Sequence, residues 1–341
     1  MMKISNLKSQ ISNFSDERGV ALVVVLWIFI FLFVVAFNFS SSVREEGTAA
    51  HRFAQETEGY YLAVAGFEDG LRRFVETSMV GAPGASPPGM GLSQSQQSPD
   101  GSWREEKLGQ GLYRVRLLDE TGKININRVN EETLRTIFTN LGIEEPRRSI
   151  LADSILDWRD DDDLTRINGA ESDYYLSLSP SYTAKNGPFD MVEELLWVRG
   201  VTPDLFYGQE DESGLRHAAL KDIFTVDSPT DRVNLRTASA EVIHALAGIP
   251  LEKSRAFVEQ RKKMSEKSLA DLLALLGNVQ GNAVMQYFVF TTPSVVTIEA
   301  AGRPAESSLE RRVKGVVRAT GGGRGFELLR WVDRDTGGIE E

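Results

Sequence analysis

Residues 18–37 read RGVALVVVLWIFIFLFVVAF, and this stretch decides the fold. No charged side chain occurs from Val20 to Phe37, and the run is about as long as a helix needs to cross a bilayer. No Ala-x-Ala pattern follows the run from Asn38 onward, so a signal-peptidase cut there is not expected. The sequence therefore predicts a membrane helix without a cut after it.

The chain has 341 residues, a formal net charge of -11 and no cysteine. This length allows a membrane helix and one or two folded domains. The acidic balance argues against a generic nucleic-acid binder, which would carry a basic face. The lack of cysteine excludes disulfides and thiolate metal sites. The charges that flank the apolar run weakly favour its leader in the cytoplasm and the bulk of the chain outside.

Apolar residues continue at helical spacing beyond the membrane run. The stripe consists of Phe53, Tyr60, Val64, Phe67, Leu71 and Phe74. This pattern predicts one helix from Val20 to about Glu76, on the order of 85 Å long. Its upper half is expected to pack on a sheet or on neighbouring subunits, and the glycines in this half allow another surface to approach closely.

Strands are predicted on both sides of a helical block. Residues 103–108 and 112–118 alternate loosely around a Gly-Gln-Gly turn, which predicts a β-hairpin. After Gly281 the period-two pattern returns, and strands are expected at 287–290, 294–300, 309–317 and 326–332, with residues 321–323 at a hairpin tip. This order indicates one sheet that is interrupted by an inserted domain.

The helical block contains an internal duplication. The segment KININRVNEETL at 123–134 resembles RVNLRTASAEVI at 232–243, and each copy then reaches a Gly-Ile pair. A second half follows in each copy, at 186–201 and at 267–277. These units resemble helix-hairpin-helix repeats, which also occur in DNA-uptake receptors and repair proteins.

The repeats supply an alternative function, that of a membrane-anchored DNA-binding or DNA-uptake protein. Nucleic-acid-binding hairpins use a glycine-apolar-glycine turn whose free backbone N–H groups approach a phosphate. In this chain the second glycine is replaced by Glu144, Thr202, Pro250 and Val279. Proline has no N–H to donate, and a glutamate repels phosphate. A helical scaffold for protein contacts is therefore favoured, and no nucleic acid is expected.

An acidic insertion at 157–185 lies between the halves of the first repeat. Calcium prefers six to eight oxygen ligands from carboxylates and carbonyls, and this loop is rich in carboxylates. It is not an EF-hand, because Arg166 and Ser172 stand where the glycine and the glutamate should be. The hypothesis is a Ca2+ site to which Asp160, Asp162, Asp163 and Glu171 contribute. The alternative is a solvated acidic surface paired with Arg159 and Arg166.

The start of the chain resembles the type III signal of type IV pilins and pseudopilins, in which a prepilin peptidase cuts after a glycine. The resemblance places the cut between Gly19 and Val20 and implies methylation of the new amine. These families usually carry Glu five residues after the cut, and this chain has Val24. A large subunit without that glutamate resembles the K-type minor pseudopilins of type II secretion, which are associated with calcium in a helical insert.

This resemblance implies an α+β fold. A long N-terminal helix is expected on a pseudopilin-like antiparallel sheet, with a large all-α domain of helix-hairpin-helix-like repeats inserted between strands. It implies a fibre-tip subunit that initiates assembly and limits fibre length, with I-, J- and H-type minor pseudopilins and the inner-membrane secretion platform as partners. The expected location is the inner membrane, crossed once, with the C-terminal domain in the periplasm.

An enzyme is not expected, because the three histidines are widely separated and H-E-x-x-H, G-x-S-x-G and phosphate-loop patterns are absent.

The expected segments are a leader at 1–19, a membrane span at 20–37, a periplasmic helix at 38–80, a flexible linker at 81–102, a first sheet part at 103–122, the inserted domain at 123–283 with repeats at 123–201 and 232–277, and a second sheet part at 284–341.

Overall fold

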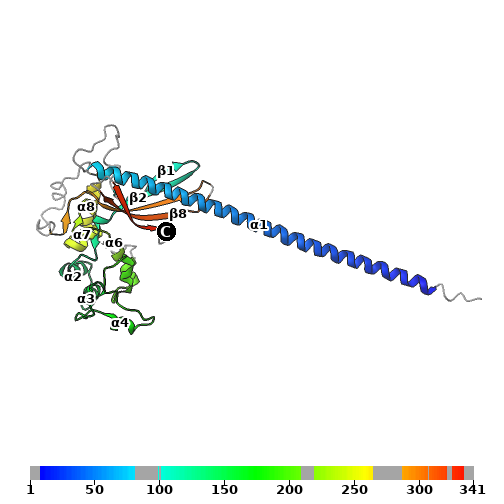
Figure 1. Ribbon diagram of the computed structural model, residues 1–341, viewed down its shortest axis with the longest axis horizontal. Helices are drawn as coiled ribbons and strands as arrows, with labels where there is room; N and C mark the ends of the chain where they lie inside the picture. The colour runs from blue at the N-terminus through cyan, green and yellow to red at the C-terminus, as the bar shows by residue number, and fades with distance from the viewer. Residues whose placement is uncertain are drawn as a thin grey trace, which may run out of the picture.

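The computed structural model describes residues 8–80, 99, 101–208, 219–263, 286–305, 307–320 and 325–333. Figure 1 shows the long helix α1, Lys8–Val80, with its C-terminal part lying on an antiparallel sheet and a domain of short helices beside that sheet. The expected linker at 81–102 lies mostly outside the described residues. Near its end, the Gly101 N–H donates to the Leu117 carbonyl, so this part is joined to the sheet.

The sheet has the strand order β1-β2-β7-β8-β9 among the described residues, and every neighbouring pair is antiparallel. The strands are β1 Arg104–Leu108, β2 Gly111–Asp119, β7 Val295–Arg303, β8 Arg311–Thr320 and β9 Gly325–Val332. Because β2 pairs directly with β7, the residues between them form an insertion between neighbouring strands. The α+β fold with an inserted helical domain is therefore confirmed.

The insertion consists of short helices and two-residue strands. The helices are the 3-10 helix η2 Glu120–Gly122, α2 Glu131–Asn140, α3 Arg147–Arg159, α4 Ser172–Leu176, the 3-10 helix η3 Val192–Trp197, α5 Pro203–Tyr207, α6 Leu220–Ile223, α7 Ala240–Ala247 and α8 Leu251–Lys263. The strands are β3 Ile124–Asn125, β4 Phe224–Thr225, β5 Val233–Asn234 and β6 Phe288–Val289. Both pairs, β3 with β4 and β5 with β6, are parallel.

The second half of the sheet begins later than expected. The sequence places residues 287–290 in the second sheet part, which is wrong, because β6 pairs with β5 instead. The Phe288 side chain is buried in the core of the inserted domain. That domain therefore extends past the expected boundary at residue 283.

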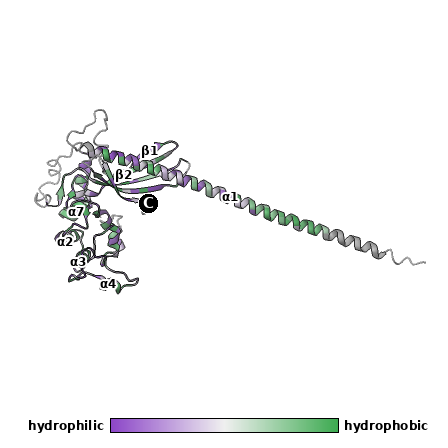
Figure 2. Ribbon diagram, in the orientation of Figure 1, coloured by the Kyte–Doolittle hydropathy of each residue, from purple (hydrophilic) through white to green (hydrophobic). Residues whose placement is uncertain are grey.

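The N-terminal part of α1 is apolar and is not covered by the head. Among the described residues, α1 is the one helix long and apolar enough to cross a membrane. Figure 2 shows its apolar stretch well away from the sheet. Leu22 and Phe33 are more than 70% exposed. The water-exposed apolar surface fits a single-pass anchor.

The C-terminal part of α1 packs against β2, β7 and β8 through small residues. Phe67, Leu71 and Phe74 are buried against the sheet. Gly70 lies so close that an added methyl group would stand 2.8 Å from Ile298 Cγ2 and 2.9 Å from Val115 Cγ2. The close approach expected at the glycines is thus present here.

The two duplicated segments make the same local hydrogen bonds. In the first copy, the Asn125 side-chain oxygen accepts the N–H of Asn127, and in the second, the Asn234 oxygen accepts the N–H of Arg236. A helix follows in each copy, α2 or α7, and the two helices contact each other. This likeness concerns local geometry, and the assignment to helix-hairpin-helix repeats stays a prediction. The second half of copy two, 267–277, lies outside the described residues.

A buried polar joint connects the sheet to the inserted domain. It consists of Asp119, Glu120, Thr225, Asn234, Thr237 and Thr297. The Glu120 carboxylate accepts hydrogen bonds from Thr297 on β7 and from Thr225 on β4, both at 2.6 Å. Because an unpaired buried carboxylate is costly, these bonds hold β4 against the sheet.

We expect Gly70→Ala to destabilise the head by about 1 kcal/mol. Overpacking costs about 1–3 kcal/mol, and the better helix propensity of alanine offsets about 1 kcal/mol of this. Gly47→Ala is the matched control, because nothing lies within 4 Å of an added methyl group there. Urea unfolding of the detergent-solubilised chain measures both variants. Equal stabilities would contradict the close packing of α1 on the sheet.

Candidate functional site

The acidic insertion begins on the last turns of α3. Asp153 and Asp157 lie one helical turn apart and are both buried, and Asp160 follows directly after the helix. Carboxylates near a helix C-terminus face the negative end of the helix dipole. These acids therefore need compensating cations or hydrogen-bond donors.

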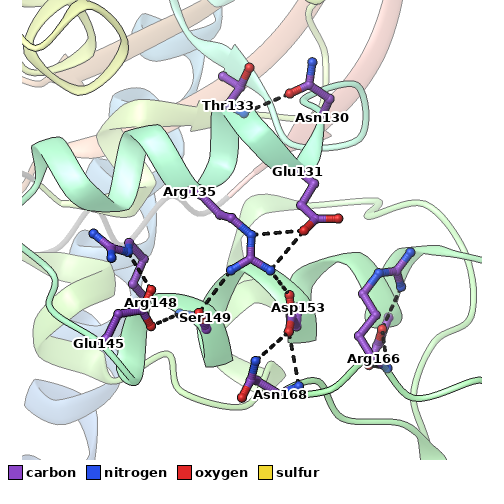
Figure 3. Close-up of polar contacts among 11 residues, drawn as sticks. Asn130, Glu131, Thr133, Arg135, Glu145, Arg148, Ser149, Asp153, Arg166 and Asn168 are labelled. Carbon is purple, nitrogen blue, oxygen red and sulfur yellow. Dashed lines mark hydrogen bonds and ion pairs between the residues drawn. The ribbon is translucent and has the colours of Figure 1, made fainter.

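Asp153 is compensated by the network in Figure 3. Arg135 on α2 donates to Asp153 and also to Ser149 on α3, with a distance of 3.0 Å to the Ser149 hydroxyl. The backbone and side-chain N–H groups of Asn168 donate to the other Asp153 oxygen, each at 3.1 Å. The network fixes α2, α3 and the acidic loop to one another.

Asp157 and Asp160 share a single guanidinium. Arg166 Nη1 lies 2.6 Å from Asp157 Oδ1 and 2.6 Å from Asp160 Oδ2. Gly169 is needed at its position, because a methyl group there would overlap the Asp157 carboxylate. The alternative interpretation pairs the acids with Arg159 and Arg166. Arg166 does pair with them, whereas the Arg159 guanidinium donates to the carbonyls of Ile126 and Val129.

Glu171 has no such compensation. Its side chain is only 3% exposed, and neither carboxylate oxygen has a hydrogen-bond partner among the described residues. Burial, and after it the negative charges of Asp157 and Asp160, raise the pKa of Glu171 to about 7. A buried carboxylate without donors is costly unless it is protonated or bound to a cation.

Most of the buried polar atoms without partners belong to α3, the acidic insertion and the residue that follows it. Within the described ranges, six of them belong to this region: Ser154 Oγ, Trp158 Nε1, Asp160 Oδ1, Glu171 Oε1, Glu171 Oε2 and Asn186 Oδ1. Four of these are carboxylate or amide oxygens, the donor atoms that calcium prefers. An orphaned set of hard oxygens fits a hard divalent cation.

The four predicted calcium ligands differ in burial and in whether their oxygens are free of hydrogen bonds. Asp160 and Glu171 contribute the buried free oxygens, whereas Asp162 and Asp163 are exposed. Asp162 Oδ1 accepts the Leu164 N–H at 2.8 Å, and Asp163 Oδ1 accepts from Asn186 Nδ2 at 2.8 Å. Within the described part of the chain, no three His, Cys, Asp or Glu side chains form a ready metal site by themselves.

Sequence reasoning missed Asn186, whose side-chain oxygen is buried without a hydrogen-bond partner among the described residues and is a further candidate metal ligand. Its backbone φ is 48°, a left-handed conformation that asparagine tolerates better than most residues. The only local signal is the Asn-Gly dipeptide at 186–187, which is typical of a turn and says nothing about a ligand.

Two of the four candidate turns have an N–H group that is already hydrogen-bonded within the chain, and the turn at 277–279 lies outside the described residues. Ile143 N–H donates to the Phe138 carbonyl at 2.9 Å, and Val201 N–H donates to the Val198 carbonyl at 3.2 Å. Phosphate recognition requires such groups to be free. This geometry does not favour the DNA-binding alternative.

Comparisons with known proteins agree with this architecture. Residues 114–208 match the family model described as type II secretion system (T2SS), protein K. Type II secretion system protein K of Klebsiella pneumoniae is 24% identical over 76% of this chain and 79% of its own length. The Pseudomonas aeruginosa protein of the same name is 28% identical over 61% of this chain and 63% of its own length.

A solved structure shares the fold. The GspK-GspI-GspJ complex of the enterotoxigenic Escherichia coli type 2 secretion system contains a chain that matches with a TM-score of 0.61 and 18% identity. The match covers 84% of this chain and 98% of that one. The family model, the two relatives and the shared fold thus make this chain similar to type II secretion system protein K.

Proposed function

We propose that this chain is the tip subunit of a type II secretion pseudopilus. In this role it initiates fibre assembly and limits fibre length, in support of protein export across the outer membrane. The observation that carries the proposal is a thin, exposed apolar helix joined to a head widened by the inserted domain (Figure 1). The apolar helix can pack in a helical bundle, and the wide head obstructs a further subunit above it. The role is structural, not catalytic.

Val24 supports a terminal position in the fibre. A carboxylate five residues after the proposed cut could neutralise the terminal ammonium of the subunit above, because an unpaired charge in an apolar bundle is costly. The tip subunit has no subunit above it and needs no such carboxylate. Val24 is half exposed in the isolated chain, as a bundle-facing apolar residue should be.

The proposed partners are the I-, J- and H-type minor pseudopilins, together with the prepilin peptidase and the inner-membrane secretion platform. Support for the first two types comes from the solved complex, in which the related chain is assembled with GspI and GspJ. The proposed location is the inner membrane, with the head in the periplasm, and the apolar span of α1 supports membrane anchoring.

We expect prepilin peptidase to cut between Gly19 and Val20 and to methylate the Val20 amine. Both residues lie within α1, so the cut would leave the apolar helix on the mature chain. Intact mass and N-terminal sequencing of membrane extracts, with and without the peptidase, measure this. A Gly19→Glu variant should stay uncut. A mature chain that starts beyond Phe37 would contradict the assignment.

Overproduction of the chain should shorten or suppress pseudopili, because an excess of tip subunits starts more fibres from the same supply of major subunits. Electron microscopy of sheared fibres measures their length. Overproduced Gly19→Glu is the matched control, because an uncut chain keeps its charged leader and cannot enter the apolar bundle. Unchanged fibre length with the processed wild-type chain would refute the proposed length control.

We further propose that the inserted domain binds Ca2+ through Glu171, Asp160 and Asn186, with Asp162 and Asp163 completing the site. The support is the set of buried, unpartnered oxygens on the first three residues. When bound, the cation would supply a positively charged partner for the Glu171 carboxylate, which has none among the described residues. No role beyond charge compensation and loop positioning is needed.

Glu171→Gln should have opposite effects without and with calcium. In EGTA at pH 8 the variant should be more stable than the wild type, because it removes an uncompensated buried charge. The folded-state pKa of about 7 lies above the ordinary value of about 4.3, so the metal-free wild type loses stability as the pH rises through this window. The advantage of the variant should therefore shrink toward pH 5.

With calcium added, the wild type should gain thermal stability and Glu171→Gln should gain little, because a ligand that binds only the folded state stabilises it. Thermal unfolding followed by circular dichroism measures both. Glu68→Gln, at an exposed position of α1, is the control and should respond like the wild type. A wild type that does not respond to calcium would refute the metal site.

A further inference from the structure

Arg166 occupies the position of a counterion in the acidic insertion. One nitrogen, Nη1, donates to both Asp157 and Asp160. The Arg166 backbone N–H also donates to Asp157 Oδ2 at 3.2 Å. Asp157 is fully buried, whereas the Arg166 side chain is 37% exposed and reaches inward from the surface. The contact joins the end of α3 to the middle of the acidic loop.

One arginine does not balance the acids that meet here. Asp157 and Asp160 share the one guanidinium, and their negative charges also contribute to the raised pKa of Glu171. Arg166 makes no hydrogen bond to Glu171, whose oxygens have no partner in the described ranges. A monovalent side chain therefore leaves an excess of negative charge, which a divalent cation can remove.

The two cations compete for one residue. Asp160 Oδ2 is bonded to Arg166, and its other oxygen, Oδ1, is buried without a partner. A cation held by Glu171 and Asp160 would place positive charge within a few ångströms of the guanidinium. Like charges at that distance repel in a partly buried site.

We propose that Arg166 is a resident counterion that lowers calcium affinity and is displaced from Asp160 when the cation binds. This inference rests on the metal site proposed above. Arg166 keeps its bond to Asp157, which lies deeper, and releases the carboxylate that the cation takes. The arginine thereby sets the calcium concentration at which the site fills, and its side chain becomes more exposed on filling.

The same contact anchors a loop with two exposed aliphatic side chains. Leu164 is 77% exposed and Ile167 is 99% exposed, on either side of Arg166. The loop is also held by Asn168, which donates to Asp153, by Asn186, which donates to Asp163, and by Arg199, which donates to the Gly169 carbonyl. Release of Asp160 therefore removes the attachment that lies between these two aliphatic side chains.

Calorimetric titration of the calcium-depleted full-length chain in detergent with calcium chloride tests the inference. Arg166→Gln should bind calcium roughly tenfold more tightly than the wild type, because a charge-assisted bond no longer has to be broken. Arg199→Gln is the matched control, since Arg199 donates to the Gly169 carbonyl in the same region and pairs with no site carboxylate. A purely structural role of Arg166 predicts the opposite, weaker binding on its loss.

Chemical labelling of the wild type gives a second measurement that needs no variant. Phenylglyoxal should modify Arg166 faster with calcium than with EGTA, while Arg199 is unchanged, as read by peptide mass spectrometry. If the wild type binds calcium but Arg166→Gln binds no more tightly, or labelling does not rise, the counterion inference fails and the metal site stands. If the wild type binds no calcium, both fail together.

Discussion

The rest of the structure depends on the close contact between α1 and β7. Gly59 and Ala63 lie against the backbone of Gly302, and no larger side chain fits there without a shift. This approach brings Phe67 and Phe74 into the sheet, where burial of each contributes about 1.5–3 kcal/mol. Because the same helix continues into the apolar span, the head and the membrane segment form one continuous element.

The inserted domain widens the head reliably only if its orientation relative to the sheet is fixed. The inserted domain is attached to the sheet by two neighbouring residues, Asp119 at the end of β2 and Glu120 at the start of η2. Asp119 accepts from Asn234 and Thr237, next to β5, and Glu120 accepts from Thr225 on β4. The second duplicated segment is thus bonded directly to this corner of the sheet, and the first is joined to it through β4, which pairs with β3. A corner of buried hydrogen bonds resists rotation more than a flexible linker would, because each bond broken removes one of the donors that stabilise a buried carboxylate.

The parts that the sequence predicts best are those with a local signal. The apolar run from Val20 to Phe37 and the period-two strands appear as expected, since burial on one face leaves a regular pattern. Phe288 was assigned wrongly, because a two-residue strand has no period and its partner Val233 is distant in sequence. Acid density in the sequence draws attention to Glu171 and Asp160, whereas the unpartnered side-chain oxygen of Asn186 depends on the tertiary structure and has no signal in the local sequence. The direction of Arg159, toward carbonyls and not toward the acids, is decided by packing around α3.

The acidic insertion combines stabilising and destabilising features in one loop. Asp153 is satisfied by Arg135 and Asn168, so the loop has a fixed frame even without a cation. Glu171 is buried within that frame and is unsatisfied, and this costs stability whenever it is ionised. A frame that persists without the cation keeps the donor oxygens in place, which reduces the ordering cost of binding. If the proposed Ca2+ site fills, the stability of the inserted domain would follow the calcium concentration around it, because a ligand bound only by the folded state adds to its stability.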